Sequence, residues 1–592
     1  MRSGSWAILS VAAIAACSSG LDEGASFAGP RASDGSSTGG STSSNNGSSA
    51  AAGSSSVPIV APEQEEDLNF RAPVVSGRWV WTANPDTGKI AVVDAKTFTV
   101  RLADAGIGPT FLTALPTGAN TSKALVINVG SHDATLLNAN ATGPVSAVGP
   151  IALQAAANAW TVGKTGKFAI AWTDSHAVMA DAAEYFQDVS VLDLRGTTPV
   201  ATRLVVGQLP SRVFINDAEK QAYIVAKTGI SVIDLSSALG PRVLSEVAVS
   251  EDPLHEDVST RDVSVMPDGS YALVRHEGSP VITLVELAKG TGKLSSVTLS
   301  GPVTDLDLVS NAKSALAVVR GNAVAVPPSA EAGAGGDTAT VSEGGAAGDP
   351  GLGGSSAAGT AGGGAPGQPP LDPRSTLAIL PIPGIFSAPT VFDTVSIDEV
   401  FGLVNIAPQG TSALLYTNAV SNSHLTVLET ARGAANYKAY RTVDVRGYVH
   451  EVFPSPDGAY AVVSLTAKDV GGRPGFATVP VDNVLPVRVQ TTDAPVFAVA
   501  QSAGPVARAI VTVSDGTARF AAYVVRMPEL VIDTVKLPSR PLAGATGLVP
   551  DAGMAYIAQA HPQGRITFIN LETGVPRTIT GFELSAKVTD GL

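Results

Sequence analysis

A strand–turn–strand pattern that recurs along most of the chain constrains its fold more than any other feature. The turn reads Pro-Asp-Gly or a variant of it, and it occurs at residues 116–118, 267–269, 408–410, 456–458 and 550–553. Weaker versions lie between these, so that successive turns are about 43–52 residues apart. Short apolar runs rich in Val, Ile, Ala and Leu flank the turns, and helical periodicity is almost absent. The pattern predicts an all-β repeat protein.

Two stretches of the sequence carry a more specific signature. Residues 81–94 (WTANPDTGKIAVVD) and 125–137 (LVINVGSHDATLL) resemble the repeat of the YVTN family of β-propellers. The Gly-x-x-Pro that leads into the inner strand of that repeat recurs at 106–109 and 207–210. The resemblance covers nearly all of 77–592 and implies a β-propeller of four-stranded blades. It is weak evidence for function, because propellers host many functions.

We count ten repeat units, which begin near residues 78, 109, 159, 210, 261, 302, 400, 449, 495 and 542. Propellers usually have about four to eight blades, so one large ring and two smaller rings in tandem are both open. The first unit lacks an obvious inner strand before Arg78, whereas residues 582–588 read as a spare strand after the last unit. A C-terminal strand that completed the first blade would close one ring and remove its open edges. We therefore prefer a single ring.

The first residues predict the location of the protein. Arg2 precedes an apolar run that is too short to span a bilayer, as in a secretory signal peptide. Ile14-Ala15-Ala16-Cys17 resembles the lipobox of bacterial lipoproteins. The resemblance implies a signal peptide at 1–16, acylation of Cys17 and a cell-envelope protein that is periplasmic or surface-exposed. Ser18 stands where Asp would favour the inner membrane, so the outer membrane is expected; the alternative is an ordinary signal peptide that happens to contain a cysteine.

Two low-complexity regions flank or interrupt the repeats. Residues 17–67 consist of Cys17 and a Ser/Gly-rich tether that contains too little apolar surface to fold. Residues 329–372 are rich in Gly and Ala, with fourteen glycines within 331–370. Without this stretch the one overlong repeat shrinks to an ordinary period, which favours a loop inserted in one blade over an interdomain linker. The propeller is expected to span 68–592.

The composition narrows the function classes. The formal net charge is −14, which disfavours nucleic acid as a partner. The single cysteine rules out a disulfide within the chain and a thiolate metal cluster. We find no nucleophile elbow, zinc-protease motif or phosphate-binding loop, and we predict no cofactor.

The seven histidines fall in related places within the repeats. Those that follow the second strand of a unit are His132, His176, His276, His424 and His561, while His255 precedes an inner strand and His450 begins one. In a propeller these positions lie on one face, so we take the five as ligand-binding candidates. Imidazole suits zinc or copper, but no His-x-His pair is present and a metal site stays undecided. The alternative is that they are ordinary exposed loop residues.

A second set of candidates lies five residues before the turn of each unit, a position expected near the central channel. It holds Phe111, Arg212, Asp262, Asp305, Leu403, Glu451 and Ala545. Four of the seven are charged, in a chain with only 15 % charged residues. Arg212, Asp262, Asp305 and Glu451 are therefore candidates for binding a polar ligand. Alternatively they solvate the channel or pair with one another, Arg212 with Asp262 for instance.

Two functions from different classes fit these features. The first is a lipid-anchored binding or scaffold protein whose loop-rich face meets a protein, a glycan or a small molecule. The second is a propeller enzyme of lactonase or redox type that uses polar groups at the channel mouth. The absence of a recognisable nucleophile favours the first.

The lipid anchor is directly testable. We predict that Cys17→Ser abolishes acylation and moves the protein from the membrane pellet to the soluble fraction, because the sequence offers no other apolar segment long enough to span a bilayer. Fractionation after a high-salt wash is the measurement. A Cys17→Ser protein that still pellets with membranes would contradict the lipoprotein interpretation.

Overall fold

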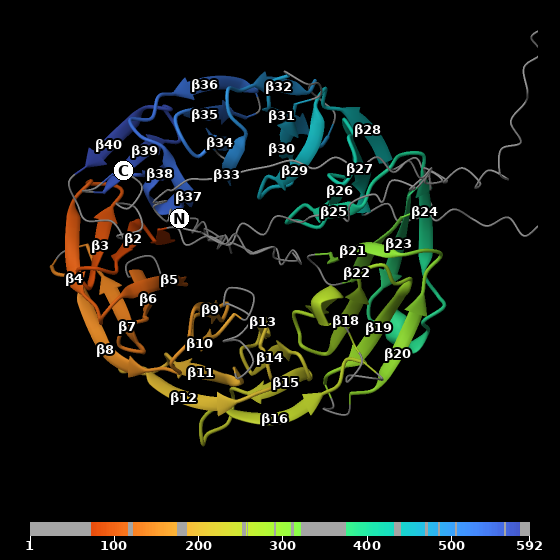
Figure 1. Ribbon diagram of the computed structural model, residues 1–592, viewed down its shortest axis with the longest axis horizontal. Helices are drawn as coiled ribbons and strands as arrows, with labels where there is room; N and C mark the ends of the chain where they lie inside the picture. The colour runs from red at the N-terminus through yellow and green to blue at the C-terminus, as the bar shows by residue number, and fades with distance from the viewer. Residues whose placement is uncertain are drawn as a thin grey trace, which may run out of the picture.

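The computed structural model describes residues 73–580 except 117–121, 142, 175–185, 251–255, 257, 289–291, 310–312, 321–374, 431–439, 468–471, 483–485, 504–505, 528 and 562–563. Within these residues the strands form ten antiparallel sheets of four strands each. The sheets stand side by side around one ring, as the blades of a ten-bladed β-propeller (Figure 1). The structure therefore confirms the all-β class, and it confirms one ring rather than two.

Each blade uses four consecutive strands. Blades 1 to 5 consist of β1 (Val74–Ser76), β2 (Trp79–Asn84), β3 (Lys89–Asp94), β4 (Val100–Asp104); β5 (Pro109–Leu115), β6 (Ser122–Asn128), β7 (Asp133–Ala139), β8 (Ser146–Ala152); β9 (Ala159–Val162), β10 (Phe168–Trp172), β11 (Asp188–Asp193), β12 (Val200–Val205); β13 (Arg212–Ile215), β14 (Gln221–Ala226), β15 (Gly229–Asp234), β16 (Arg242–Val247); and β17 (Arg261–Val265), β18 (Tyr271–His276), β19 (Val281–Glu286), β20 (Leu294–Thr298).

Blades 6 to 10 consist of β21 (Val303–Leu308), β22 (Ser314–Val319), β23 (Ser375–Pro381), β24 (Asp393–Ile397); β25 (Leu403–Ile406), β26 (Ser412–Tyr416), β27 (His424–Glu429), β28 (Tyr440–Asp444); β29 (Tyr448–Pro454), β30 (Tyr460–Thr466), β31 (Gly475–Pro480), β32 (Arg488–Thr491); β33 (Val496–Ser502), β34 (Arg508–Ser514), β35 (Phe520–Arg526), β36 (Val531–Val535); and β37 (Pro541–Val549), β38 (Met554–Gln559), β39 (Arg565–Asn570), β40 (Pro576–Thr580). The short helices are η2 (Val258–Thr260), α2 (Gly384–Ser387) and η4 (Pro550–Ala552). No helix of the described chain is both long and apolar enough to cross a membrane.

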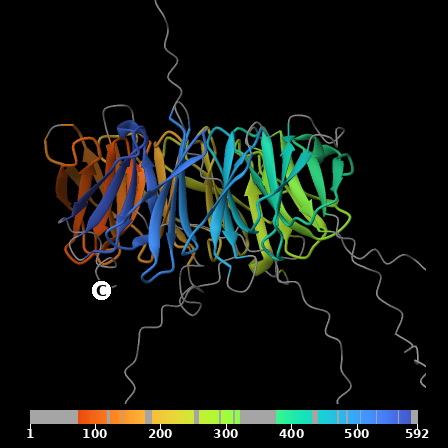
Figure 2. The same ribbon diagram turned by 90° about the horizontal axis from the view of Figure 1, so that it is seen from above.

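The connections between strands divide between the two faces of the ring (Figure 2). The first strand of every blade lies nearest the ring axis and the fourth lies on the rim (Figure 1). Because the strands alternate in direction, the turns from first to second and from third to fourth strand share one face. We call the other face, which carries the second-to-third connections and the segments between blades, the loop face.

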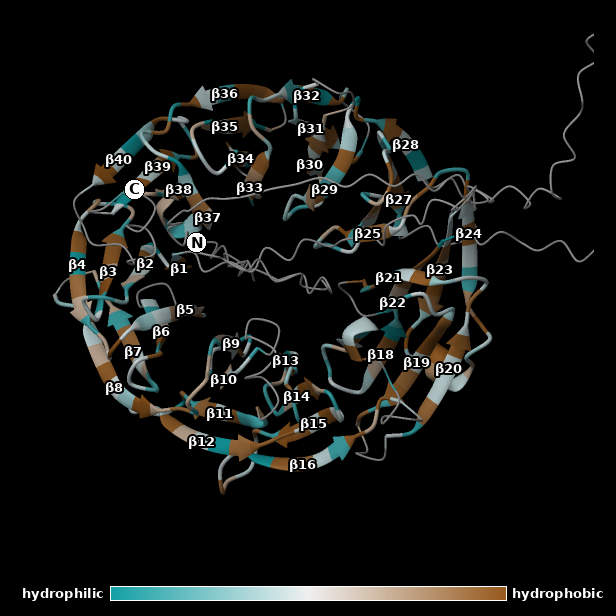
Figure 3. Ribbon diagram, in the orientation of Figure 1, coloured by the Kyte–Doolittle hydropathy of each residue, from teal (hydrophilic) through white to brown (hydrophobic). Residues whose placement is uncertain are grey.

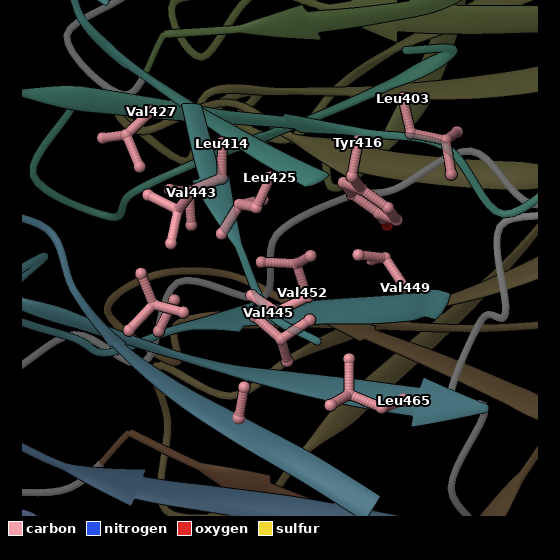
Figure 4. Close-up of a cluster of buried hydrophobic side chains, with 14 residues drawn as sticks. Leu403, Leu414, Tyr416, Leu425, Val427, Val443, Val445, Val449, Val452 and Leu465 are labelled. Carbon is pink, nitrogen blue, oxygen red and sulfur yellow. The ribbon is translucent and has the colours of Figure 1, made fainter. Parts of the chain in front are cut away.

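The core consists of clusters that lie between blades. Ten of these clusters each join two neighbouring blades, so that every junction around the ring is filled with apolar side chains. The middle strands supply most of them, and much of their ribbon is brown in Figure 3. In the cluster between blades 7 and 8, Leu414 and Leu425 of one blade face Val452 and Leu465 of the next (Figure 4). Burial of apolar area at about 25 cal/mol per Å² makes this packing the main stabilising term.

Polar bridges accompany the apolar packing at each junction. In every case a side chain of one blade hydrogen-bonds a group of its neighbour. Around the ring, from the junction of blades 1 and 2 to that of blades 10 and 1, the pairs are Ser122–Ser76, Trp160–Phe111, Thr161–Val213, Arg212–Asp262, Arg275–Thr304, Val404–Asp305, Asn405–Val452, Gln501–Phe453, Thr512–Thr546 and Tyr556–Pro73. These bonds satisfy groups that the packing buries.

The Pro-Asp-Gly turn is fixed by both its backbone and its neighbour. Gly269 has φ +77°, which favours glycine, and a Cβ added there would lie 2.0 Å from the hydroxyl oxygen of Tyr223 in the preceding blade. That hydroxyl donates to the Gly269 carbonyl at 2.9 Å. Burial and the charge of Asp268 raise the pKa of Tyr223 to about 12, so it stays a donor. Gly269 therefore serves the contact between blades as well as the bend.

Ring closure differs from the sequence expectation. The first blade does have an inner strand, because β1 (Val74–Ser76) pairs antiparallel with Trp79–Trp81 of β2. The expectation that residues 582–588 supply that strand is therefore wrong, and those residues lie outside the described part of the chain. Blades 10 and 1 instead meet by packing, with Phe568 edge-on to Phe98 at 5.4 Å between ring centroids. The buried Tyr556 hydroxyl donates to the Pro73 carbonyl at 2.7 Å.

The Gly-rich segment falls within one blade. The strands on either side of it, β22 and β23, pair along their length, from Ser314 with Pro381 to Val319 with Thr376. Residues 321–374, which include the predicted loop 329–372, are not among the described residues. The signal peptide at 1–16, Cys17 and the tether up to residue 67 also lie outside them.

Closure by packing leads to a stability prediction. Phe568 is fully buried at the junction of blades 10 and 1, and Phe476 is fully buried at that of blades 8 and 9. We expect Phe568→Ala and Phe476→Ala each to cost about 3–5 kcal/mol, because both leave a cavity. Thermal and denaturant unfolding are the measurements, with the exposed Val575→Ala as a control that changes neither.

A Phe568→Ala protein as stable as the wild type, beside a destabilised Phe476→Ala protein, would mean that blades 10 and 1 do not close the ring.

Candidate functional site

The seven inner-strand candidates occupy corresponding positions in the blades. Arg212, Asp262, Asp305 and Glu451 pair with the residues near the end of the second strand, Val225, Arg275, Val318 and Ser464. Phe111, Leu403 and Ala545 also lie in first strands. The register shifts just before Asp305 and Glu451, as in a β-bulge, which changes the direction of the side chains there. These residues lie where the first strands begin, towards the loop face.

Three charged side chains form a chain across blades 4 to 6. Arg212 donates from Nη1 to Asp262 Oδ1 at 3.1 Å. The second oxygen of Asp262 lies 3.4 Å from Nε of Arg275. Arg275 in turn donates from Nη1 to the carbonyl of Thr304 at 2.9 Å. The structure thus brings two of the predicted residues, Arg212 and Asp262, together as an ion pair, and adds Arg275 from the second strand.

Asp305 connects blade 6 to blade 7. It is fully buried, and its carboxylate accepts hydrogen bonds from the Leu306 N–H at 2.8 Å and the Val404 N–H at 2.7 Å. Beside it, Thr304 donates to the Gly402 carbonyl at 2.7 Å. A buried carboxylate that accepts two amide donors is well compensated. The half-buried Glu451 lies two blades away, in blade 8.

Asp307 is a member of the cluster that sequence reasoning missed. It follows Asp305 by two residues in the same strand, so both side chains point to the same side. Burial raises the pKa of its carboxyl well above the usual range, and the negative charges of Asp305 and Asp262 raise it further. The positive charges of Arg275 and Arg212 lower this pKa but do not cancel the increase. The alternation of the strand, Asp305-Leu306-Asp307, was the signal that could have revealed it.

The described histidines lie towards the loop face, as the repeat pattern predicts. His132 and His561 occupy second-to-third connections, His276 ends β18, His424 begins β27, and His450 lies near the start of β29. His176 and His255 fall outside the described residues. No three or more His, Cys, Asp or Glu side chains of the described chain are grouped so that they could hold a metal ion.

Two of these histidines contact acids from the segment that precedes their blade. His276 Nε2 lies 2.7 Å from Glu256 Oε1, and the same carboxylate accepts from Arg261 Nη1 at 3.2 Å. His424 Nδ1 lies 2.9 Å from Glu399 Oε2. In both places the contact joins an interblade segment to the second-to-third connection of the next blade, so it holds the loop face together.

A cleft opens on the loop face between blades 8 and 9. Its volume is about 450 Å³, and it is lined by Gly472, Arg473, Pro474, Thr492, Asp493 and Arg519. Arg473 Nη1 lies 3.3 Å from Asp493 Oδ1. Sequence reasoning missed this site, because its lining comes from three separate segments and includes no histidine.

Comparisons with known proteins find similar solved structures but no related sequence. No protein-family model matches the chain, and no curated protein sequence matches it. Among solved structures, dihydro-heme d1 dehydrogenase NirN in complex with DHE is similar at 10 % identity, covering 89 % of this chain and 76 % of its own, with a TM-score of 0.41. A eukaryotic initiation factor is similar at 12 % identity, over 86 % of this chain and 97 % of its own, with a TM-score of 0.45. The β-propeller domain of Cps50 (Swd1) from Myceliophteria thermophila matches at 12 % identity, over 63 % and 97 %, with a TM-score of 0.29.

The raised pKa of Asp307 gives a pH prediction. An acid whose pKa is higher in the folded protein than in the unfolded chain costs no stability at a pH where it is protonated in both states. The cost in stability grows as the pH rises from the unfolded-state pKa to the folded-state pKa. We therefore expect Asp307→Asn to match the wild type near pH 4 and to melt at a higher temperature than the wild type at neutral pH.

Melting curves across the pH range are the measurement. Asp305→Asn is the contrasting variant, because it removes the carboxylate oxygen that accepts the hydrogen bond of the Val404 N–H. It should lower the free energy of unfolding by about 1–3 kcal/mol at neutral pH. A difference between wild type and Asp307→Asn that does not change with pH would contradict the assignment.

Proposed function

We propose that this chain is a binding protein of the bacterial cell envelope, held at the outer membrane by a lipid on Cys17, that presents its loop face to a partner. The observation that carries the proposal is how the charged inner-strand residues are used. Arg212, Asp262 and Asp305 are engaged in contacts between blades, so they serve the ring more readily than a ligand.

The loop face offers features suited to recognition. Ile107, between blades 1 and 2, is 70 % exposed, and the neighbouring Val129 is 40 % exposed. We take these two adjacent apolar side chains as the part of the loop face that would contact a partner. The cleft beside Arg473 and Arg519 lies on the same face. A protein or a glycan of the envelope is the class of partner that a lipid-anchored propeller would meet.

The experiment compares two exposed apolar residues on opposite faces. Ile107 lies on the loop face, and Leu239, 94 % exposed, lies in the third-to-fourth turn of blade 4 on the other face. Purified full-length protein is cross-linked to solubilised envelope fractions, and the products of wild type, Ile107→Glu and Leu239→Glu are compared. We expect Ile107→Glu to lower the yield of a saturable product about fivefold or more, as for an interface residue, and Leu239→Glu to leave it unchanged.

Equal loss in both variants, or loss only in Leu239→Glu, would contradict a partner site on the loop face.

A propeller enzyme of lactonase or redox type is the second candidate function, and Asp307 is the observation that favours it. A carboxyl with a raised pKa is suited to proton transfer. This candidate predicts turnover of a lactone or of a quinone-linked substrate that Asp307→Asn abolishes. Turnover with that dependence would replace the binding proposal, and turnover that survives Asp307→Asn would contradict a role for this residue.

A further inference from the structure

On the loop face, an acidic residue of the interblade segment contacts a histidine of the following blade at two places. Glu256 precedes β17 and contacts His276 at the end of the second strand of that blade. Glu399 precedes β25 and contacts His424 at the start of the third strand of that blade. In both blades the acid points forward to the second-to-third connection.

The junction of blades 8 and 9 departs from this arrangement. The corresponding acid is Asp493, three residues before β33, and the corresponding basic residue is Arg519, just before β35. Asp493 points backward instead and pairs with Arg473 of blade 8 at 3.3 Å. Within the described chain the Arg519 guanidinium has no hydrogen bond and no ion pair, although its charge interacts with the nearby Asp515 carboxylate. Arg519 and Asp493 both line the cleft of about 450 Å³.

The lining of this cleft suits an oxyanion. A guanidinium presents planar donors that match a carboxylate, sulfate or phosphate group in two-point contacts. The Thr492 hydroxyl is already used, since it donates to the Ala494 carbonyl at 2.7 Å. Gly472 and Pro474 add no charge and no aromatic surface. The volume lies within the range of small-molecule sites, which is about 300–1,000 Å³.

We propose that this cleft binds a small polar molecule through one oxyanion, held by Arg519 with Arg473 beside it. This inference rests on the proposed binding function and deepens it by naming the class of ligand. Two acids lie near and limit the affinity. Asp493 is paired with Arg473, and Asp515 accepts from Thr517 and from the Arg519 backbone N–H. The expected dissociation constant is therefore about 1–10 mM, a weak site for the isolated group.

Calorimetric titration of the full chain tests the site. The probes are glucuronate, inorganic sulfate and inorganic phosphate, with glucose as a neutral control for glucuronate. We expect saturable binding of at least one anion and none of glucose. Binding of glucuronate alone would identify a sugar acid as the source of the oxyanion, whereas binding of sulfate or phosphate would indicate an ester of those acids.

Three variants assign the binding to the cleft. Arg519→Gln should weaken binding about tenfold or more. Asp493→Asn should tighten it about threefold or more, because it frees Arg473 and removes a negative charge. Arg203→Gln is the matched control, since Arg203 is an exposed, ion-paired arginine on the rim of blade 3, and it should leave binding unchanged. Melting curves establish that each variant is folded.

No saturable binding, or equal weakening by Arg519→Gln and Arg203→Gln, would overturn the proposal. A folded Asp493→Asn protein that binds the anion no more tightly than the wild type would also overturn it. These outcomes are separate from the cross-linking experiment, because Ile107 lies at the junction of blades 1 and 2, three blades round the ring from this cleft (Figure 1). A failed titration with an intact Ile107 effect would leave the binding function standing.

Discussion

The packing of each blade against the next is the interaction on which the rest of this structure depends. A ring has as many junctions as blades, and all of them must close at once. Here the apolar clusters and the polar bridges recur at every junction of the described ring, including the one between blades 10 and 1. Because no strand is shared between the ends of the described ring, that last junction relies on side chains such as Phe568 and Tyr556. Its stability therefore comes from the same forces as that of its neighbours.

This dependence on junctions also shapes the polar groups near the axis. First strands lie where blades converge, so a charged residue there is close to the neighbouring blade as well as to solvent. Arg212 and Asp262 pair across one junction, and Asp305 binds the backbone across another. Asp307 is left with burial and like charges, which raise its pKa. The loop face is less constrained, because its segments extend beyond the packed strands.

Much of the fold could be predicted because blades repeat. The period, the Pro-Asp-Gly turns and the apolar runs reflect local rules, and they locate ten blades and most of their first strands. The pairing of Arg212 with Asp262 was foreseeable because equal positions in successive blades become neighbours. The strand Val74–Ser76 escaped because three residues carry too little pattern to be recognised. The cleft escaped because the direction in which Asp493 points goes with a local ion pair, with Arg473, which no repeat encodes.

Closure of the described ring by side-chain packing has a further consequence for how the order and number of its blades can change. When one blade of a propeller combines strands from both ends of the chain, those ends must stay together. Such a propeller cannot gain or lose that blade as a unit. In this ring each described blade is built from one continuous stretch, and Pro73 lies against Tyr556 of the last blade. The described ring is therefore suited to circular permutation, with its last blade linked to its first and new ends placed in a turn between blades. By the same logic, whole blades can be duplicated or lost as units, which offers a route to a ring as large as this one.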